Sequence, residues 1–428
     1  MAGRPEAGAM GALPDGARRV AEAVDPDRVM WRIEELARIG RTARGGVTRP
    51  AFSEEEARAT ALFAGWMQGT GLTVAFDDFG NLFGSTDDNA PGAAVCTAGS
   101  HLDSVPDGGK YDGPLGIIGA LETIEAMRAA GVTPRRPMEL IVWRAEEPGR
   151  FAAGRIGSQV FAGQLTIAEL LEQGAGFDLA GWLGREADRP RRAAGRTLTD
   201  YLELHIEQGR RLEEAGAQIG VVTAIAAATR VRAVLQGAAD HSGATPMGLR
   251  RDALCAAAEL ILATEAAGLA ESAAGSVATA VIIRAEPGAM NVVPGRVELF
   301  LDVRGIVPAS IAATVERIRA EGQAIGARRG IALEWTELTR GTPVTFDEGV
   351  VAGVESTAWA LGYSALRLPS GAGHDAQTVA PLARAGMIFV PSAGGISHAP
   401  DEYTPPADIE RGVKTLAAAW ARLALEGE

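Results

Sequence analysis

A histidine and two aspartates stand close together in the first third of the chain, at a spacing that suits metal chemistry. A mostly apolar run at residues 93–98 leads to His101 and Asp103, and a glycine-rich loop then delivers Asp112. Side chains on a strand repeat every two residues, so His101 and Asp103 should leave the strand end on the same side. An imidazole with carboxylates beside it is the donor set that a divalent metal needs. The alternative is a strand end followed by a solvated polar loop.

Two further stretches carry acids or a histidine at expected strand ends. The run 138–143 is apolar except for one glutamate, as in strands covered on both faces, and Glu146 and Glu147 follow it. In open α/β sheets active sites lie beyond the carboxyl ends of strands, so these adjacent carboxylates are candidate site residues. In the run 201–209, leucine and isoleucine alternate with acids and His205. A solvent-facing histidine is the alternative interpretation of His205.

All five histidines of the chain have similar surroundings. Each lies on or near an expected strand end or in a glycine-rich turn, beside carboxylates or small residues. They are His101, His205, His241, His374 and His398. Chance placement of all five in such positions is improbable, and a shared site is the economical interpretation.

Length and composition indicate a large globular protein. With 428 residues, of which 47% are hydrophobic, two domains are the natural expectation. The net charge of −13 argues against a nucleic-acid binder, which would present a basic patch. We find no apolar run of membrane-spanning length, and we expect residues 1–26 to form a flexible tail. Cys96 and Cys255 lie in apolar segments without metal-site spacing, so we expect buried thiols in a cytoplasmic protein.

The expected elements describe a sheet-based domain that is interrupted by a second one. A capping-box sequence starts a helix at residues 53–68, and a hairpin and several buried strands follow it. From about residue 225 the order changes to strand, helix, two strands, helix and strand, which is the split βαβ unit of ferredoxin-like domains. We therefore predict an α/β protein. A mixed-sheet α/β/α domain would occupy residues 27–224 and 342–428, with a ferredoxin-like α+β domain inserted at 225–341.

Six short motifs, in order along the chain, resemble those of one enzyme family. They are GSHLDSVPDGGKYDG (99–113), EEPGRF (146–151), LHIEQG (204–209), DHSGATPM (240–247), SGAGHDA (370–376) and GGISHAPDE (394–402). Through them the chain is similar to the M20-type metallohydrolases. More narrowly, it resembles the hydantoinase/carbamoylase subgroup of N-carbamoyl-L-amino-acid hydrolases, allantoate amidohydrolases and β-ureidopropionases. The resemblance implies a metallohydrolase catalytic domain with an inserted lid and dimerisation domain.

The resemblance also implies two divalent metal ions per subunit, close enough to share a ligand. The implied ligands of one ion are His101, Asp112 and His205, and those of the other are Asp112, Glu147 and His398. Asp112 would bridge the two ions. Mixed imidazole and carboxylate ligands suit Zn²⁺ or Mn²⁺, and Co²⁺ or Ni²⁺ as well. Asp103 would form a hydrogen bond to His101 and fix its tautomer.

Catalytic roles follow from the same resemblance. Glu146 would be the general base: it would take a proton from a water between the metals, so that a metal-bridging hydroxide attacks the carbonyl, and pass that proton to the leaving nitrogen. His241 would polarise the carbonyl from the partner subunit, which implies a homodimer through the inserted domain. The reaction would cleave the C–N bond of an N-carbamoyl-L-amino acid, allantoate or β-ureidopropionate.

Five residues are candidates for binding the substrate. They are Gln208, Asn291, Arg304, Gly371 and His374. A planar guanidinium such as that of Arg304 fits a carboxylate bidentately, and Asn291 matches a carboxylate-binding position of the subgroup. The Gln208 amide can both donate to and accept from a ureido group. A salt bridge to Asp302 is the alternative for Arg304, and a structural role is the alternative for His374.

Three alternative functions can be compared with this one by the sequence features that each would require. An N-acyl-amino-acid deacylase or dipeptidase on the same scaffold is the main alternative, and a substrate panel separates the two. A serine hydrolase using Ser100, Ser370 or Ser397 is disfavoured because no G-x-S-x-G sequence is present. A metal-binding protein without catalysis is disfavoured by Glu146, since a general base has no use there. The expected partner is thus a small carboxylate-bearing substrate, with no nucleic acid and no membrane.

Overall fold

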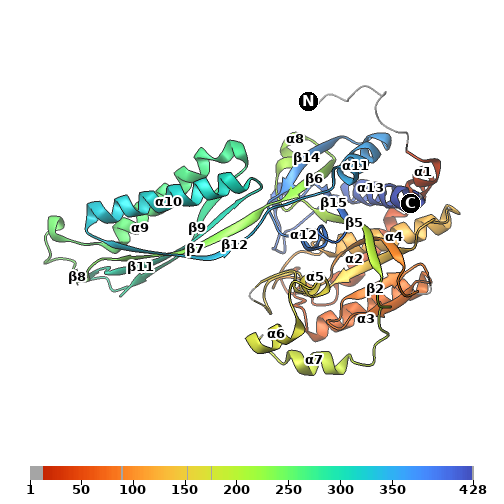
Figure 1. The fold of residues 1–428 in the computed structure, drawn as a ribbon, viewed down its shortest axis with the longest axis horizontal. Helices are drawn as coiled ribbons and strands as arrows, with labels where there is room; N and C mark the ends of the chain where they lie inside the picture. Colours follow the sequence, from red (N-terminus) through yellow and green to blue (C-terminus); the bar gives the residue numbers. More distant parts are fainter. Residues whose placement is uncertain (1–12, 88–89, 152, 175, 427–428) are drawn as a thin grey trace. The chain divides into compact units, whose positions relative to one another are not determined.

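The computed structural model describes residues 13–87, 90–151, 153–174 and 176–426, and the chain divides into two compact units. Unit 1 comprises Met1–Thr223 and Phe346–Glu428, and unit 2 is the segment Ala224–Thr345 between them. The boundaries predicted from the sequence, 224/225 and 341/342, lie close to these. The two units are described separately below (Figure 1).

The sheet of unit 1 is mixed, and four adjacent strands in it are parallel. In spatial order its strands are β1 (Thr73–Phe76), β2 (Leu82–Ser85), β4 (Met138–Trp143), β3 (Ala94–His101), β5 (Thr197–Ile206), β15 (Arg384–Val390) and β6 (Ile219–Ile225), with β14 (Ala365–Ser370) also paired with β6. The last two residues of β6 belong to unit 2, where they pair with the short strand β13 (Val344–Thr345). Strands β4, β3, β5 and β15 run parallel to one another. Their carboxyl ends therefore meet at one edge of the sheet, and the predicted mixed α/β architecture is confirmed.

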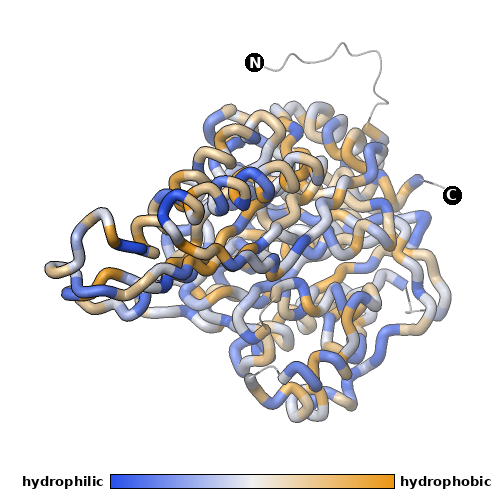
Figure 2. Tube along the Cα trace, turned by 60° about the vertical axis from the view of Figure 1, so that its left-hand side comes forward, coloured by the Kyte–Doolittle hydropathy of each residue, from blue (hydrophilic) through white to orange (hydrophobic). Residues whose placement is uncertain are grey.

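Helices cover this sheet, which explains the continuous apolar runs of its central strands. Helices α3 (Glu54–Gly69), α4 (Pro114–Ala129), α11 (Glu348–Ala360), α12 (Asp375–Val379) and α13 (Pro406–Leu425) pack on its strands. The other described helices of unit 1 are α1 (Asp15–Glu22), α2 (Pro26–Ala37), α5 (Ile156–Phe161), α6 (Ile167–Gln173), α7 (Leu179–Arg185) and α8 (Arg211–Ala215). Every residue of β4 is buried, as in a strand covered on both faces. Hydrophobic stretches of the chain run through the interior, and hydrophilic stretches lie mostly outside (Figure 2).

The N-terminal segment departs from the prediction. The flexible tail that we expected through residue 26 is wrong from residue 13 onward, because α1 spans Asp15–Glu22 and packs against α13. Its Ala17, Val20 and Ala21 are buried. A helix this short is held by tertiary packing more than by its own propensity, so its sequence pattern alone is weak. The rest of that predicted tail, residues 1–12, lies outside the described residues.

Unit 2 is a four-stranded antiparallel sheet with two helices packed on it (Figure 1). Its elements follow the order β7 (Ala227–Gln236), α9 (Ala253–Ala270), β9 (Val277–Glu286), β11 (Arg296–Gly305), α10 (Pro308–Arg329) and β12 (Ala332–Arg340). The spatial strand order is β12-β7-β11-β9, which leaves β12 and β9 as edge strands. Two short strands, β8 (Asp240–His241) and β10 (Val292–Val293), form a separate antiparallel ladder.

Helix α9 is apolar except for Glu259, Thr264 and Glu265. Its Leu260 and Ala267 join the core of unit 2, whereas Leu262 and Leu269 are exposed. In the described part of the chain it is the one helix long and apolar enough to cross a membrane by length and composition, a run that our inspection of the sequence missed. Core helices pass the same test, so this is weak evidence for a membrane span. Cys255, expected to be buried, is exposed on this helix, because apolar residues occupy both its buried and its exposed sides and the pattern indicates the buried side only weakly.

A buried arginine anchors the chain directly after β4. The guanidinium of Arg144 donates to the carboxylates of Glu56 at 2.9 Å and Glu186 at 2.7 Å, and it lies 3.7 Å from the ring centre of Phe52. The predicted capping box is therefore only half formed. Ser53 accepts from the backbone N–H of Glu56, but the Glu56 side chain turns to Arg144. This cluster fixes the point at which the chain leaves β4.

Replacing this arginine should destabilise the protein strongly. We expect Arg144→Met to lower the free energy of unfolding by about 3 kcal/mol, because two buried carboxylates lose their cation. Arg38→Met is the matched control, since Arg38 makes an exposed pair with Glu35 that is worth at most about 1 kcal/mol. Urea denaturation followed by circular dichroism measures both. Equal effects of the two substitutions would contradict a buried anchor.

Candidate metal centre

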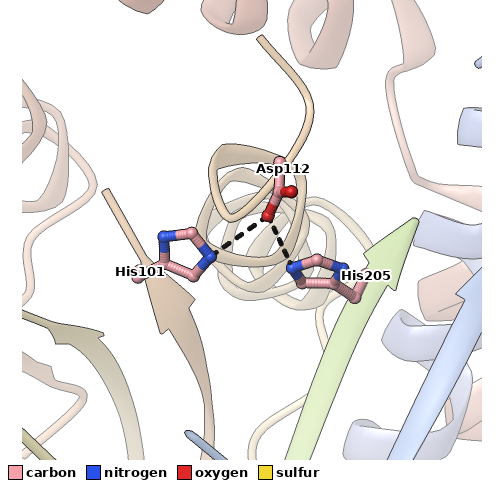
Figure 3. Close-up of side chains that lie close together, drawn as sticks. All are labelled: His101, Asp112 and His205. Carbon is pink, nitrogen blue, oxygen red and sulfur yellow. Dashed lines mark ion pairs between the residues drawn. The ribbon is translucent and has the colours of Figure 1, made fainter. Parts of the chain in front are cut away.

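Two buried histidines, His101 and His205, each direct their Nε2 atom at the carboxylate of Asp112. His101 ends β3 and His205 lies near the end of β5, so two adjacent parallel strands bring them together. Nδ1 of His101 lies 3.0 Å from the carbonyl oxygen of Asp103, and Nδ1 of His205 lies 2.9 Å from that of Ile206. A carbonyl only accepts, so each Nδ1 donates and each Nε2 is the atom available to a metal. The two Nε2 atoms lie 3.3 and 3.1 Å from Oδ1 of Asp112 (Figure 3).

The other oxygen of Asp112 faces a second group. Nε2 of His398 lies 3.2 Å from Oδ2 of Asp112 and 3.3 Å from Oε1 of Glu147. Two sets of donors result, each with its atoms within 4.8 Å of one another: His101, Asp112 and His205, and Asp112, Glu147 and His398. The structure thus brings together the five residues expected to be ligands. Asp112 offers a different oxygen to each set, as a carboxylate bridge between two ions requires.

The donor chemistry fits divalent cations. Imidazole nitrogens together with the carboxylates of Asp112 and Glu147 form the mixed nitrogen and oxygen set that suits ions such as Zn²⁺ or Mn²⁺. Nε2 of His205 is buried, and no described residue gives it a hydrogen bond of good geometry. A buried polar atom without a partner costs free energy unless a ligand satisfies it. These residues therefore fit a bound metal.

Protons and metal ions compete for these nitrogens. Hydrogen bonds to Asp112 and Glu147 raise the pKa of His398 to about 10. Burial lowers the pKa of His101, but the hydrogen bond to Asp112 and the other nearby acids raise it well above its usual value. Burial would raise the pKa of Asp112, yet the surrounding histidines hold it well below its usual value. Without a cation, a proton therefore occupies the His398 ring at neutral pH, where a metal would have to displace it.

The contact expected of Asp103 is different in the structure. Its carboxylate does not hydrogen-bond to His101, since Oδ1 lies 3.8 Å from Nδ1 and the backbone carbonyl of Asp103 takes that bond instead. The carboxylate accepts from the backbone N–H groups of Glu146 at 3.2 Å and Glu147 at 3.0 Å. Asp103 therefore orients the histidine through its main chain and the paired glutamates through its side chain. Sequence spacing shows which residues are near but not which atoms meet.

Glu146 lies beside the ligands without belonging to either donor set. Its side chain is buried, and Oε2 lies 3.9 Å from Nε2 of His101. Burial raises the pKa of Glu146 well above its usual value, and the nearby carboxylates of Asp375 and Glu147 raise it further. A carboxyl group with a raised pKa can hold and release a proton closer to neutral pH than an ordinary glutamate can.

Strained backbone marks the segments that carry the site. Ala145, Gln208 and His398 have φ values of 59°, 59° and 55°, in the left-handed region that non-glycine residues rarely adopt. Such conformations cost on the order of 1–3 kcal/mol and persist where the surroundings enforce them. Gly113 has φ 82°, and a Cβ there would lie 2.5 Å from the ring of His101. Glycine is therefore required between the bridging aspartate and α4.

Gln208 lies beside Asp112, and its amide nitrogen has a hydrogen-bond partner whereas its amide oxygen has none among the described residues. Its Nε2 donates to Oδ2 of Asp112 at 2.7 Å. Its Oε1 is buried, and among the described residues nothing donates to it. The side chain thus steadies the bridging carboxylate while one amide oxygen stays available to a ligand.

His374 packs behind His205. The two ring centres are 4.5 Å apart, and Nε2 of His374 lies 3.0 Å from Oγ of Ser370. Burial lowers the pKa of His374 well below its usual value, so the ring is neutral. His374, His205 and Glu203 form a third close set of donors, but Glu203 already accepts from Ser100 and from the backbone of α12. These groups hold the His205 ring in place. Gly371 is exposed in the turn before His374.

Two residues of the last motif make contacts that the sequence did not predict. Ser397 and Glu402 flank His398, and both side chains contact the Asp112 segment. Glu402 is buried, and burial together with the charge of Asp112 raises its pKa to about 7. The available signal was the pair of acids Asp401 and Glu402, three and four residues after His398.

Unit 2 carries the remaining predicted residues. His241 and Asn291 are exposed on neighbouring chain segments, where the N–H of Ser242 donates to the carbonyl of Asn291 at 2.9 Å. Nδ1 of His241 accepts from the backbone N–H groups of residues 243 and 244, at 3.1 Å each. Nδ1 is therefore an acceptor, and the proton of the neutral ring is on Nε2.

Arg304 is half-buried and pairs with Asp302. Its Nε lies 2.7 Å from Oδ1 of Asp302. Nη2 of Arg304 lies 3.3 Å from the other oxygen, Oδ2. This is the salt bridge that was the alternative interpretation of Arg304.

The likeness to known proteins covers nearly the whole chain. Residues 97–422 match Peptidase family M20/M25/M40. The chain belongs to this family. This M20 chain is 40% identical over 400 residues to N-carbamoyl-L-amino acid amidohydrolase of Geobacillus stearothermophilus, covering 92% of this chain and 97% of that one. It is 36% identical over 415 residues to ureidoglycolate hydrolase of Oryza sativa subsp. japonica, covering 94% and 86%.

A solved structure supports the same relationship for the M20 chain. The hydantoinase/carbamoylase family amidase from Burkholderia multivorans superposes on it with a TM-score of 0.88 and 35% sequence identity. The superposition covers 95% of this chain and 99% of that chain. Both units of the M20 protein therefore have counterparts in that amidase.

Metal binding by the M20 protein should release protons and strengthen with pH. Because the pKa of His398 is raised to about 10 in the metal-free protein, a metal must displace a proton from it at neutral pH. We expect Zn²⁺ or Mn²⁺ affinity to rise from pH 6 to pH 9. Calorimetry in buffers of different ionisation enthalpy measures the protons released. His241→Asn should leave the release unchanged, and pH-independent affinity without proton release would contradict the assignment.

Proposed function

We propose that this M20 protein is a metal-dependent amidohydrolase that cleaves the C–N bond of N-carbamoyl-L-amino acids or related ureido acids, such as allantoate or β-ureidopropionate. The observation that carries the proposal is Asp112, whose two oxygens face two donor sets. Glu146 lies beside them as a proton carrier. The names of the full-length relatives, N-carbamoyl-L-amino acid amidohydrolase and ureidoglycolate hydrolase, support the same substrate class.

The cofactors in this proposal are two divalent metal ions per subunit, Zn²⁺ or Mn²⁺, with Co²⁺ and Ni²⁺ also suited. When bound, such ions supply Lewis-acid polarisation of the carbonyl and increase the acidity of water. Glu146 takes the proton of the attacking water and delivers it to the leaving nitrogen. Its buried carboxyl group lies 3.9 Å from Nε2 of His101, beside the donor atoms of the first set.

Residues of both units contribute to substrate binding in this proposal. The unpaired Oε1 of Gln208 accepts an N–H of the ureido group. His241 presents the Nε2–H that polarises the carbonyl, since its Nδ1 already accepts two backbone N–H groups. Asn291 and Arg304 bind the substrate carboxylate, and Asp302 orients the guanidinium for that contact. Gly371 and His374 line the site around His205.

Unit 2 is, we propose, the lid and the dimerisation domain. Its edge strand β9 exposes Val281, Ile282 and Ile283 in succession, whereas the other edge strand, β12, carries charged residues along its length. Natural edge strands are guarded by charges unless a partner covers them. A second copy of this chain pairing along β9 would cover these residues and bring His241 to the site of the partner subunit. The free thiols Cys96 and Cys255 suit a cytoplasmic protein.

A substrate panel tests the proposed activity. We expect hydrolysis of N-carbamoyl-L-amino acids, allantoate or β-ureidopropionate to stop after metal removal and to return with Zn²⁺ or Mn²⁺. Release of the amine product is measured for each substrate, with N-acetyl amino acids and dipeptides included. A preference for acetyl or peptidyl substrates would assign the protein to the deacylases or dipeptidases instead. Undiminished turnover after thorough chelation would overturn the metal-dependent mechanism.

Glu146→Gln is the variant that isolates the proton carrier in this experiment. It keeps the size of the side chain but cannot shuttle a proton, so kcat should fall by roughly 10²–10⁴-fold. Metal stoichiometry, measured by atomic emission, should stay unchanged because Glu146 is not a ligand. Unchanged turnover would refute the role.

The proposed dimer is tested on its apolar edge. Val281→Lys should convert the dimer to monomers in light scattering, because a buried charge opposes strand pairing. Turnover should fall with it, since each site would lose the partner's histidine. Leu338→Lys is the control, placed on the other edge strand, where Leu338 is also exposed. A protein that is monomeric and fully active at assay concentration would count against this arrangement.

A further inference from the structure

Glu402 connects two loops that are 290 residues apart in the chain. Its Oε1 accepts from the backbone N–H groups of Tyr111 at 3.1 Å and Asp112 at 3.2 Å. Its Oε2 accepts from Oγ of Ser397 at 3.0 Å. The side chain is buried, so these bonds form away from bulk water and an unpaired N–H there would be costly.

Ser397 extends this contact to the bridging carboxylate. Its Oγ lies 3.1 Å from Oδ2 of Asp112, as well as within hydrogen-bond distance of Glu402. The fit around Glu402 is tight, since a Cβ at Gly109 would collide with its carboxyl group. Backbone and side chain of Asp112 are therefore both tied to the loop that carries His398.

The second donor set has the greater need of such support. The side chains of His101 and His205 are 2% and 1% exposed, and strand pairing fixes them, whereas that of His398 is 46% exposed. His398 also sits on left-handed backbone, in a loop beyond β15. Packing alone does not hold it in place.

We propose that Glu402 is a positioning residue that, with Ser397, fixes the Asp112 segment and the His398 loop as one unit and so sets the geometry of the second metal site. Glu402 contacts neither donor nitrogens nor reacting atoms and acts through the residues that it ties together. This inference rests on the proposed dinuclear centre. It goes beyond it by assigning the support of one of the two ions to a single buried carboxyl group.

Metal titration of the metal-free protein tests the role. Calorimetry with Zn²⁺ or Mn²⁺ on the full chain should resolve two binding steps. Glu402→Asp, whose shorter side chain cannot span both loops, should weaken the weaker step by about 10–100-fold and leave the tighter step within a few-fold. Glu402→Gln keeps an acceptor for the two N–H groups and should retain most of that affinity. Asp401→Asn is the matched control: it removes the exposed carboxylate directly before Glu402 and should change neither binding step.

Thermal unfolding of the metal-free variants separates positioning from general stabilisation. A purely structural role would lower the melting temperature of Glu402→Asp and leave both affinities of the folded protein unchanged, which would overturn the inference. Equal weakening of both steps would overturn it as well. If the wild-type protein binds two ions but hydrolyses no ureido substrate, the proposed function fails and the positioning role stands. Binding of only one ion by the wild type would overturn the positioning role.

Discussion

The carboxylate of Asp112 is the contact on which the rest of the centre depends. One of its oxygens faces His101 and His205, and the other faces His398, so the two donor sets share this side chain. The ends of β3 and β5 and the loop after β15 must all be placed relative to it. Asp112 itself directly precedes Gly113 and the start of α4, where the positive end of the helix dipole favours a carboxylate.

Around this carboxylate the protein gathers more acids than it can neutralise by itself. Asp103, Glu146, Glu147 and Glu402 are all buried within the same region. Burying several carboxylates raises their pKa values or draws in cations, because isolated charge is costly away from water. The raised pKa of Glu146 and that of His398 are two signs of the same imbalance. The buried carboxylates are thus stabilised by nearby positive charge, and in the metal-free protein bound protons supply it.

Much of this arrangement could be predicted from the sequence, and the reasons are physical. Alternation on strands and the apolar run of β4 indicate which residues reach the end of the sheet, so His101, His205 and the two glutamates were predictable. Contacts between side chain and backbone were not, because they depend on loop conformation. The hydrogen bond of His101 was therefore predicted to involve the carboxylate of Asp103, whereas it involves the backbone carbonyl. No role was predicted for Glu402. Helix α1 and the exposure of Cys255 depend on tertiary packing, which the pattern of an eight-residue or a mostly apolar segment does not predict.

The two histidines of the first donor set are oriented by main-chain carbonyls, and this has a consequence for how the site can change. Main-chain atoms are present whatever side chain a position carries. Substitutions in the surrounding loops can therefore change the neighbouring side chains without removing the carbonyls that orient these two histidines. The orientation of the two rings is therefore tolerant of change in the side chains around them. The loop side chains can vary because the atoms that orient the two histidines belong to the backbone.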